Sequence, residues 1–275
     1  PRTGLSIARN RGIECIRGQL VAFLDDDVLV RPNWLVSIVR CFERRQADCI
    51  GGRTLVLWEG EPHEAVSCCE TELASFDLGE EDLELTGRMT PIGANLAFRR
   101  SVFADGTRFA TNLGRIGNLL LSGEDTELVE RIRKQGGRVW YCADSVVGHR
   151  TGGDRLSASF YIRRHHWFGV SRSVMDRRSR GPWFQWARAI AAAGLCPLTQ
   201  LPKWLWSKVA RNPRGQLLSL CALSKLTGYW RGLLLNDNAI ACQPQNEAEA
   251  AAVESEAVSA ASDQSAQASM TGGPV

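Results

Sequence analysis

Short apolar runs alternate with longer amphipathic segments along the first 150 residues. We expect strands where the apolar runs are short and uninterrupted, at 20–24, 48–57, 91–98 and 138–147. Apolar residues at helical spacing predict helices over 4–16, 32–45 and 122–134, and a short helix is expected from Arg100. This alternation is typical of an α/β protein with a mixed, mostly parallel sheet flanked by helices.

The pattern changes after residue 157. Residues 158–238 interleave six tryptophans with lysine and arginine, and the longest uncharged window, between Arg188 and Lys203, holds only 14 residues. A membrane span needs about 20 apolar residues, so this window is too short to be one. We predict three units: an α/β domain over 1–157, a basic helical segment over 158–238, and a disordered acidic tail over 239–275 that lacks aromatic residues.

Charge divides the chain in a similar way. The net charge of +3 combines an acidic first part, a segment over 150–231 with 15 basic and two acidic residues, and an acidic end. Tryptophan with arginine and lysine suits the headgroup layer of a membrane, so peripheral membrane contact is one interpretation. A basic helical subdomain packed on the core is the other. Basic and aromatic residues also bind nucleic acids, but no nucleic-acid motif accompanies them, and we predict no nucleic-acid partner.

Nine cysteines are scattered through the chain without a CxxC pair. Zinc sites and disulfide frameworks usually show regular spacing, so reduced thiols are the simpler interpretation. The cysteines therefore predict a cytoplasmic protein. Together with the basic segment, they predict a peripheral position at the inner face of the cell membrane.

Three consecutive aspartates, Asp25 to Asp27, follow directly after the predicted strand at 20–24. In open α/β sheets, ligands bind beyond the carboxyl ends of the strands. Carboxylates there can hold a hard divalent cation such as Mg²⁺ or Mn²⁺, although an exposed charged turn would have the same sequence. His149 follows the predicted last strand, where it would either complete such a metal site through a ring nitrogen or serve as a surface or capping residue.

A second group of acids stands at the start of the predicted helix over 122–134, in the sequence SGED. Carboxylates in a first helical turn are stabilised by the helix dipole, and Ser122 with Asp125 resembles a capping box. The alternative is a chemical role. A carboxylate that faces the cleft removes the proton from an acceptor hydroxyl, which makes Asp125 a candidate general base.

Taken in order, these motifs resemble those of family 2 glycosyltransferases, which have the GT-A fold. The similarity covers about residues 4–150 and rests on the stretches ARNRGIECIRGQLVAFLDDDVLVRPNWL, IGANLAFRRSVF and LGRIGNLLLSGEDTELVERIRKQGGRVWYCADSVVGHR. The resemblance implies a metal-dependent transferase that moves a sugar from a nucleotide-sugar donor to a hydroxyl group, with inversion at the anomeric carbon. The acceptor would be a glycan, a polysaccharide or a lipid-linked molecule.

The resemblance implies a donor-binding role for the three aspartates. Asp25 would face the nucleotide sugar, and Asp27 would bind the metal that bridges its diphosphate, with Asp26 between them. His149 would complete the metal site. The implied cofactor is a divalent metal, Mn²⁺ or Mg²⁺.

The resemblance also implies roles around the acceptor. The loop that contains Gly93 and Asn95 would line the sugar and acceptor region. Asp125 would be the catalytic base, with Glu124 beside it. Two basic residues in YIRRHHWFG are similar to the family's basic-aromatic loop for the diphosphate or the acceptor: Arg163 and Arg164.

The chain departs from the family at its start. Family members begin with a strand–helix–strand unit that contacts the nucleotide base and ribose, whereas residues 2–16 already resemble the helix just before the aspartates. We therefore expect an N-terminally truncated GT-A-like domain. The alternative function is that of a catalytically inactive truncated transferase that binds carbohydrate, membrane or a partner protein. A homo-oligomer and a synthase complex are the candidate assemblies.

Overall fold

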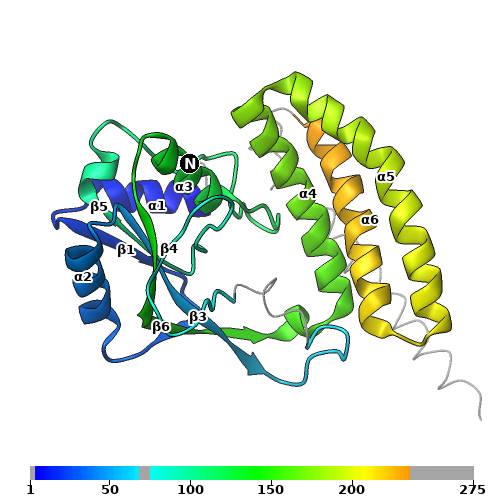
Figure 1. Ribbon diagram of the computed structural model, residues 1–275, viewed down its shortest axis with the longest axis horizontal. Helices are drawn as coiled ribbons and strands as arrows, with labels where there is room; N and C mark the ends of the chain where they lie inside the picture. Colours follow the sequence, from blue (N-terminus) through cyan, green and yellow to red (C-terminus); the bar gives the residue numbers. More distant parts are fainter. Residues whose placement is uncertain (1–3, 68–74, 236–275) are drawn as a thin grey trace, which may run out of the picture.

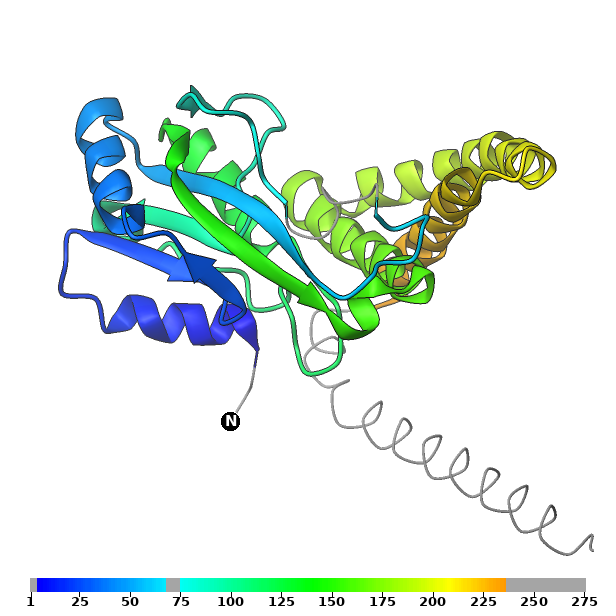
Figure 2. The same ribbon diagram turned by 90° about the horizontal axis from the view of Figure 1, so that it is seen from below.

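The computed structural model describes residues 4–67 and 75–235. Figure 1 shows two parts, a twisted sheet with short helices around it and a separate layer of long helices. The two parts lie side by side in Figure 2 as well. The predicted disordered tail over 239–275 lies outside the described residues.

Within the described residues the sheet has six strands: β1 (Leu20–Leu24), β2 (Val28–Val30), β3 (Cys49–Glu59), β4 (Leu83–Glu84), β5 (Asn95–Arg99) and β6 (Val139–Gly152). Five of them follow the order β1-β5-β3-β6-β2, and β4 pairs with β6. The mixed α/β fold with flanking helices is confirmed. The expectation of a mostly parallel sheet is wrong: β3 and β6 are parallel, but the other four pairings of described strands are antiparallel. The reason is that β5 runs opposite to both of its neighbours, β1 and β3, and that β2 and β4 both run opposite to β6.

β1 begins and ends where the apolar run predicted, but it lies at one end of the sheet order. Among the described strands, β5 alone pairs with it. Phe23 packs edge-on against Phe98 and Phe109, whereas Ala22 and Leu24 are exposed. The strand is confirmed but its complete burial is not, because on the face opposite Phe23 only Leu20 packs against a core cluster.

β6 is longer than predicted and contains His149, which the sequence placed after the last strand. It runs parallel to β3 as far as Gly152, with a register shift after Gly52. β2, which the apolar pattern did not predict, pairs along the other side and places Val28 opposite His149. At His149, β6 therefore pairs with β3 on one side and with β2 on the other, and these pairings hold His149 within the sheet.

Helices cover both faces of the sheet. α1 (Leu5–Glu14) and α3 (Glu124–Lys134) share one core with inward residues of β5 and β6. α2 (Trp34–Arg45) buries Ile38 and Phe42 against the opposite face, where Ile50 and Ala97 lie. Successive residues of a strand point to opposite faces of the sheet, so neighbouring residues such as Leu96 and Ala97 belong to different cores.

Three long helices make up the second layer: α4 (Ala158–Arg180), α5 (Pro182–Val209) and α6 (Pro213–Leu234). α4 packs Trp167 and Val170 on residues 110–121, and α6 crosses it closely at Gly169, where a Cβ would meet the backbone of α6. α5 lies on the side away from the sheet (Figure 1). These helices lie within the segment predicted to be basic and helical, and the last of them ends at Leu234. Within 4–67 and 75–235, no helix has the length and hydropathy required to cross a bilayer.

Candidate active site

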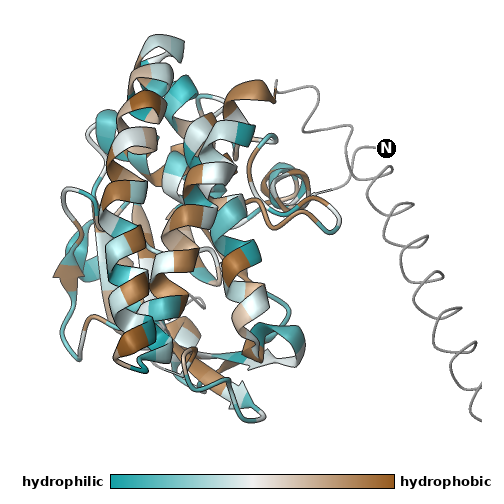
Figure 3. Ribbon diagram, turned by 90° about the vertical axis from the view of Figure 1, so that its right-hand side faces the viewer, coloured by the Kyte–Doolittle hydropathy of each residue, from teal (hydrophilic) through white to brown (hydrophobic). Residues whose placement is uncertain are grey.

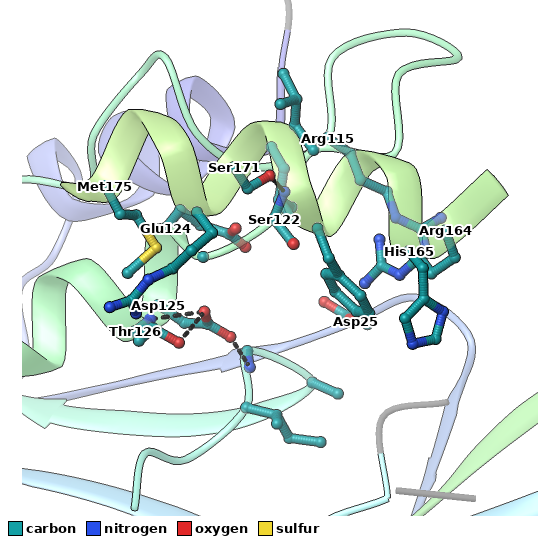
Figure 4. Close-up of a pocket in the computed structure, with 18 of the residues that line it drawn as sticks. Asp25, Arg115, Ser122, Glu124, Asp125, Thr126, Arg164, His165, Ser171 and Met175 are labelled. Atoms are coloured by element: carbon teal, nitrogen blue, oxygen red, sulfur yellow. Dashed lines mark hydrogen bonds between the residues drawn. The ribbon is translucent and has the colours of Figure 1, made fainter. Parts of the chain in front are cut away.

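A cavity of about 460 Å³ lies between the sheet and α4. Its wall includes residues of α1, the end of β1, the turn at 92–94, the start of α3, and α4. Figure 4 shows the side chains of these segments around a common space, with Glu124 and Asp125 on one side and Asp25, Arg115 and Arg164 on the other.

Arg9 of α1 lines the cavity and is only 5% exposed. Its Nη2 lies 3.1 Å from Oδ1 of Asp25, and its Nη1 lies 2.9 Å from Oε1 of Glu124. The same Nη2 donates to the carbonyl oxygen of Gly93 at 3.2 Å. One buried guanidinium therefore connects the end of β1, the 92–94 turn and the start of α3. The fit is close, since a Cβ on Gly93 would lie 2.6 Å from Nη2.

The structure brings together two of the three aspartates and the distant histidine. Oδ1 of Asp27 lies 3.3 Å from Nε2 of His149, and its Oδ2 lies 2.9 Å from Nη1 of Arg155. One donor atom from each of Asp25, Asp27 and His149 lies within 4.8 Å of the other two. Pairing of β2 with β6 accounts for this proximity, because Arg150 beside His149 donates its N–H to the carbonyl oxygen of Asp27.

This set of donors fits a divalent cation. Asp27 Oδ1 is buried and accepts no hydrogen bond from the described part of the chain, so a ligand at this oxygen would satisfy it. Burial lowers the pKa of His149, and the charge of Asp27 opposes this only in part. The imidazole is therefore neutral at physiological pH and offers a lone pair beside two carboxylates. Two carboxylates and one imidazole are suitable ligands for Mn²⁺ or Mg²⁺.

Asp125 lines the cavity from the first turn of α3. Its Oδ2 accepts the N–H of Gly93 at 2.8 Å, and its Oδ1 accepts the N–H of Thr126 at 2.6 Å. Figure 4 shows both bonds as dashed lines at the cavity wall. The capping-box interpretation of Ser122 and Asp125 is wrong, because the N-cap is Gly123 in a left-handed conformation (φ 89°) and no side chain caps the helix. The carboxylate reaches across to the 92–94 turn instead.

Glu124 stands next to the proposed base but in a different environment. It is 5% exposed, and burial raises its pKa to about 7. The neighbouring charge of Asp125 also raises this pKa, and Arg9 opposes both effects. Near neutral pH the carboxyl is therefore divided between its protonated and ionised forms, with the ionised form paired to Arg9. This position suits Glu124 to hold Arg9 rather than to contact substrate.

Arginines give the α4 side of the cavity a positive charge. Arg164 lines the cavity and donates from Nη1 to the carbonyl oxygen of Leu120 at 3.1 Å. Burial, together with the positive charges of Arg115 and Arg155, lowers the pKa of Arg164 to about 10. Guanidinium groups this close repel one another, and an anionic group between them, such as a phosphate, would relieve the repulsion.

Asn95 does not line the cavity, although its loop does. It is 1% exposed and accepts a hydrogen bond from Nε1 of Trp34 at 2.9 Å. Its amide nitrogen donates to the carbonyl oxygens of Arg53 and Ser145. Asn95 thus joins β5 to α2, β3 and β6, and within its motif Gly93 is the residue that reaches the site.

Two further predicted residues lie outside the cavity wall. Arg163 is exposed on α4 and pairs with Asp154 at 2.8 Å. Asp26 is exposed and borders a neighbouring hollow that it shares with Asp27 and Arg155. Arg164 therefore lies in the cavity and Arg163 does not, and Asp25 lines the cavity whereas Asp26 borders the neighbouring hollow.

Sequence reasoning missed three arginines of this site, Arg9, Arg115 and Arg155. The first two lie within stretches that carry the family resemblance, ARNRG and LGRIG. An arginine on a helix or in a loop is usually solvated, so residue type alone indicates no role in a site. The two carboxylates that hold Arg9, those of Asp25 and Glu124, are 16 and 115 residues away along the chain.

Comparison with known proteins shows the family to which this chain belongs. The family described as "Glycosyltransferase like family 2" matches residues 2–168. Glucosyl-dolichyl phosphate glucuronosyltransferase of Haloferax volcanii is 29% identical over 180 residues, which cover 63% of this chain and 56% of that protein. Pre-mycofactocin glycosyltransferase of Mycobacterium tuberculosis is 29% identical over 178 residues, covering 64% and 35%. Succinoglycan biosynthesis protein ExoM of Rhizobium meliloti is 25% identical over 209 residues, covering 71% and 62%. The chain therefore spans about a third to three fifths of these relatives.

Two solved structures overlap with this chain in part. The mannosyltransferase PcManGT from Pyrobaculum calidifontis, in complex with GDP-Man and Mn²⁺, has a TM-score of 0.49 and 14% identity, covering 84% of this chain and 67% of that one. GalNAc-T7 with UDP, GalNAc and Mn²⁺ has a TM-score of 0.41 and 17% identity, covering 62% and 37%. Neither overlap is close enough to place a donor or a metal in this chain.

Proposed function

The chain belongs to glycosyltransferase-like family 2, and on this premise we propose that it transfers a sugar from a nucleotide-sugar donor to a hydroxyl group of an acceptor. One observation carries the proposal. A single cavity contains Asp25 and His149, which belong to a set of metal-binding donors, and Asp125, a carboxylate oriented by backbone N–H groups. A metal-assisted displacement needs these two parts within reach of one substrate.

Asp125 is the proposed general base. The N–H groups of Gly93 and Thr126 fix its orientation, and a carboxylate has further lone pairs with which it can accept the acceptor's proton. After losing that proton, the acceptor oxygen attacks the anomeric carbon of the donor. The bond from this carbon to the diphosphate oxygen breaks, and its electron pair leaves with the nucleoside diphosphate. Attack and departure on opposite faces invert the anomeric configuration.

The donor's diphosphate is assigned to the opposite side of the cavity. Asp25, Asp27 and His149 would hold the divalent metal, Mn²⁺ or Mg²⁺. A metal bound there would offset the negative charge that develops on the leaving phosphates. Arg155 and Arg164 contribute fixed positive charge on the same side, and such pre-oriented charge stabilises a developing anion.

The proposed acceptor is a glycan, a polysaccharide or a lipid-linked molecule. The name of the Haloferax relative contains glucosyl-dolichyl phosphate, and that of the Rhizobium relative contains succinoglycan biosynthesis. Arg115 and Arg164 also line the cavity and would contact a phosphate on a lipid-linked acceptor. The cavity therefore suits a phosphate-bearing acceptor as well as a phosphate-bearing donor.

Replacement of the base tests the proposal. Asp125→Asn keeps the size of the side chain and an oxygen for the Gly93 N–H, but an amide does not accept the acceptor's proton. We expect transfer to fall by about 10²–10⁴-fold, whereas binding of the donor stays unchanged. Release of nucleoside diphosphate from a panel of UDP- and GDP-sugars, with alkyl glycosides as acceptors and Mn²⁺ present, measures transfer. Calorimetric titration with and without Mn²⁺ measures binding, which should weaken when the metal is removed.

Glu130→Gln is the matched control, because Glu130 lies on the same helix outside the cavity. This variant should transfer as the unaltered chain does. A fully active Asp125→Asn variant would remove Asp125 as the base. Failure of the unaltered chain to bind or cleave any nucleotide sugar in the panel would contradict the transferase activity itself.

A further inference from the structure

The outer face of α5 carries an unusually large set of exposed apolar side chains. Of the 22 large hydrophobic residues that are exposed within the described ranges, nine belong to this helix. The most exposed are Trp183 at 84%, Val209 at 79%, Leu198 at 74% and Trp206 at 73%. A contiguous apolar surface that stays exposed in a folded domain marks an interaction site.

These residues form a stripe along the helix. Six of them follow one another in steps of three, four, seven or eight residues, which return to the same side of a helix: Trp183, Ile190, Leu198, Leu201, Leu205 and Val209. The opposite side of α5 is buried, with Gln185 donating to the backbone and side chain of Ser173 in α4. Figure 3 views the molecule from the side of the long helices, where brown hydrophobic residues recur along their length.

Cations border the stripe. Exposed basic residues stand just before the helix, in its second half and just after it: Arg180, Lys203, Lys208, Arg211 and Arg214. The sequence has no aspartate or glutamate from 177 to 236. The surface therefore combines apolar side chains with positive charge and offers no acid to a partner.

Two prolines make α5 suited to an interface rather than to the interior of a bilayer. Pro197 and Pro202 lie inside the helix and cannot donate hydrogen bonds to the carbonyl oxygens of Ala193 and Leu198. Hydrocarbon provides no donor for such oxygens, whereas water and headgroups at a membrane surface do. An amphipathic helix of this kind lies in the plane of the membrane.

We propose that α5 binds the surface of a bilayer that contains anionic lipids. The apolar stripe would enter the boundary between headgroups and acyl chains, and the bordering cations would contact lipid phosphates. A second copy of this chain is a poorer occupant. Pairing two such faces would bring cations such as Lys203 and Lys208 of both copies together without an acid between them.

The proposed membrane face and the cavity share the same helical layer. α4 lines the cavity with Arg164 and Phe168, α6 adds Lys225, and both helices pack against α5. Because α5 lies on the side away from the sheet, the helical layer separates the proposed membrane face from the cavity. The membrane inference rests on α5 alone and not on the proposed function.

Vesicle sedimentation with the full 275-residue chain, without donor or metal, tests the inference. We expect binding to vesicles of phosphatidylcholine with phosphatidylglycerol, weaker binding to phosphatidylcholine alone, and weakening by added salt. Leu198→Glu should lower the partition coefficient at least about tenfold, because it places a charge within the stripe. Lys203→Gln should lower it about fivefold, the contribution of one cation at an anionic surface.

Leu35→Glu is the matched control, since Leu35 is 60% exposed on α2, at the other end of the molecule in Figure 1. It should leave vesicle binding unchanged, and circular dichroism verifies that every variant is folded. Absence of vesicle binding, or equal losses in the control, would overturn the inference. A dimer in vesicle-free solution that Leu198→Glu converts to a monomer would assign the face to a second copy instead. Loss of transfer with intact vesicle binding would contradict only the proposed function.

Discussion

The cavity and the outer face of α5 depart from ordinary protein surfaces in opposite directions. In the cavity, charged residues are buried, with Arg9 and Glu124 each 5% exposed. On α5, large apolar residues are exposed, with Trp183 at 84% and Leu198 at 74%. Folding normally buries apolar groups and leaves charges in water, so each region carries a free-energy cost that the rest of the fold offsets.

The two regions differ in where their partners are. Arg9 has its partners within the chain, since Asp25, Glu124 and the carbonyl oxygen of Gly93 surround it. The helix α5 packs one side against α4 and α6, and the apolar stripe on its other side faces outward. Substitutions in the cavity should therefore change the free energy of unfolding, whereas substitutions on the stripe should change binding and leave folding intact.

Removal of Arg9 should produce the largest effect on stability. Arg9→Met leaves the buried carboxylate of Glu124 without its cation, and breaking a buried ion pair in this way costs about 3–5 kcal/mol. Protonation of Glu124 should keep the loss near the lower end of this range. Urea unfolding measures it. Arg11→Met is the control on the same helix, where an exposed pair with Glu14 contributes less than about 1 kcal/mol; equal losses in both variants would contradict the assigned role of Arg9.

The buried carboxyl group should also make stability depend on pH. Burial raises the pKa of Glu124 from 4.5 to about 7, so the folded chain keeps a proton that the unfolded chain releases between these values. The stabilisation from this proton is complete below pH 4.5 and is lost as the pH rises through 7. Its size is about 1.4 kcal/mol for each unit by which the pKa of Glu124 differs between the folded and the unfolded chain. Urea unfolding from pH 4.5 to 7.5 should therefore show a smaller decrease for Glu124→Gln than for the unaltered chain. Parallel curves would contradict the raised pKa.

The smallest effect on stability is expected on α5. Leu198→Glu changes a side chain that is 74% exposed, so the free energy of unfolding should change by less than about 0.5 kcal/mol. Leu128→Ala is the contrast, because this leucine is 0% exposed in the core beside α3 and its truncation costs about 2–5 kcal/mol. If Leu198→Glu instead unfolds the protein at low urea, the stripe belongs to the fold and is not a separable surface.

Much of the fold followed from local patterns. The helical spacing over 32–45 and 122–134 corresponds to α2 and α3 within two residues at each end, and the run at 20–24 corresponds to β1. Local patterns did not predict which strands pair. β5 inserts between β1 and β3, and β2 pairs with β6, so the partners are far apart in the chain. The turn at 92–94 illustrates the difference: its apolar residues looked like the start of a strand, yet they form part of the cavity wall.

By itself, the sequence determined which chemical groups are available: the aspartates after β1, Glu124 and Asp125 at the start of α3, and a basic, acid-free segment after them. Tertiary structure alone decided which of these groups meet. It placed Arg9 between two acids, directed Asn95 into the sheet, and turned one side of α5 outward because α4 and α6 occupy the other. The physical reason is that residue type and spacing define the faces of a helix or strand, whereas packing between elements sets the distances between those faces.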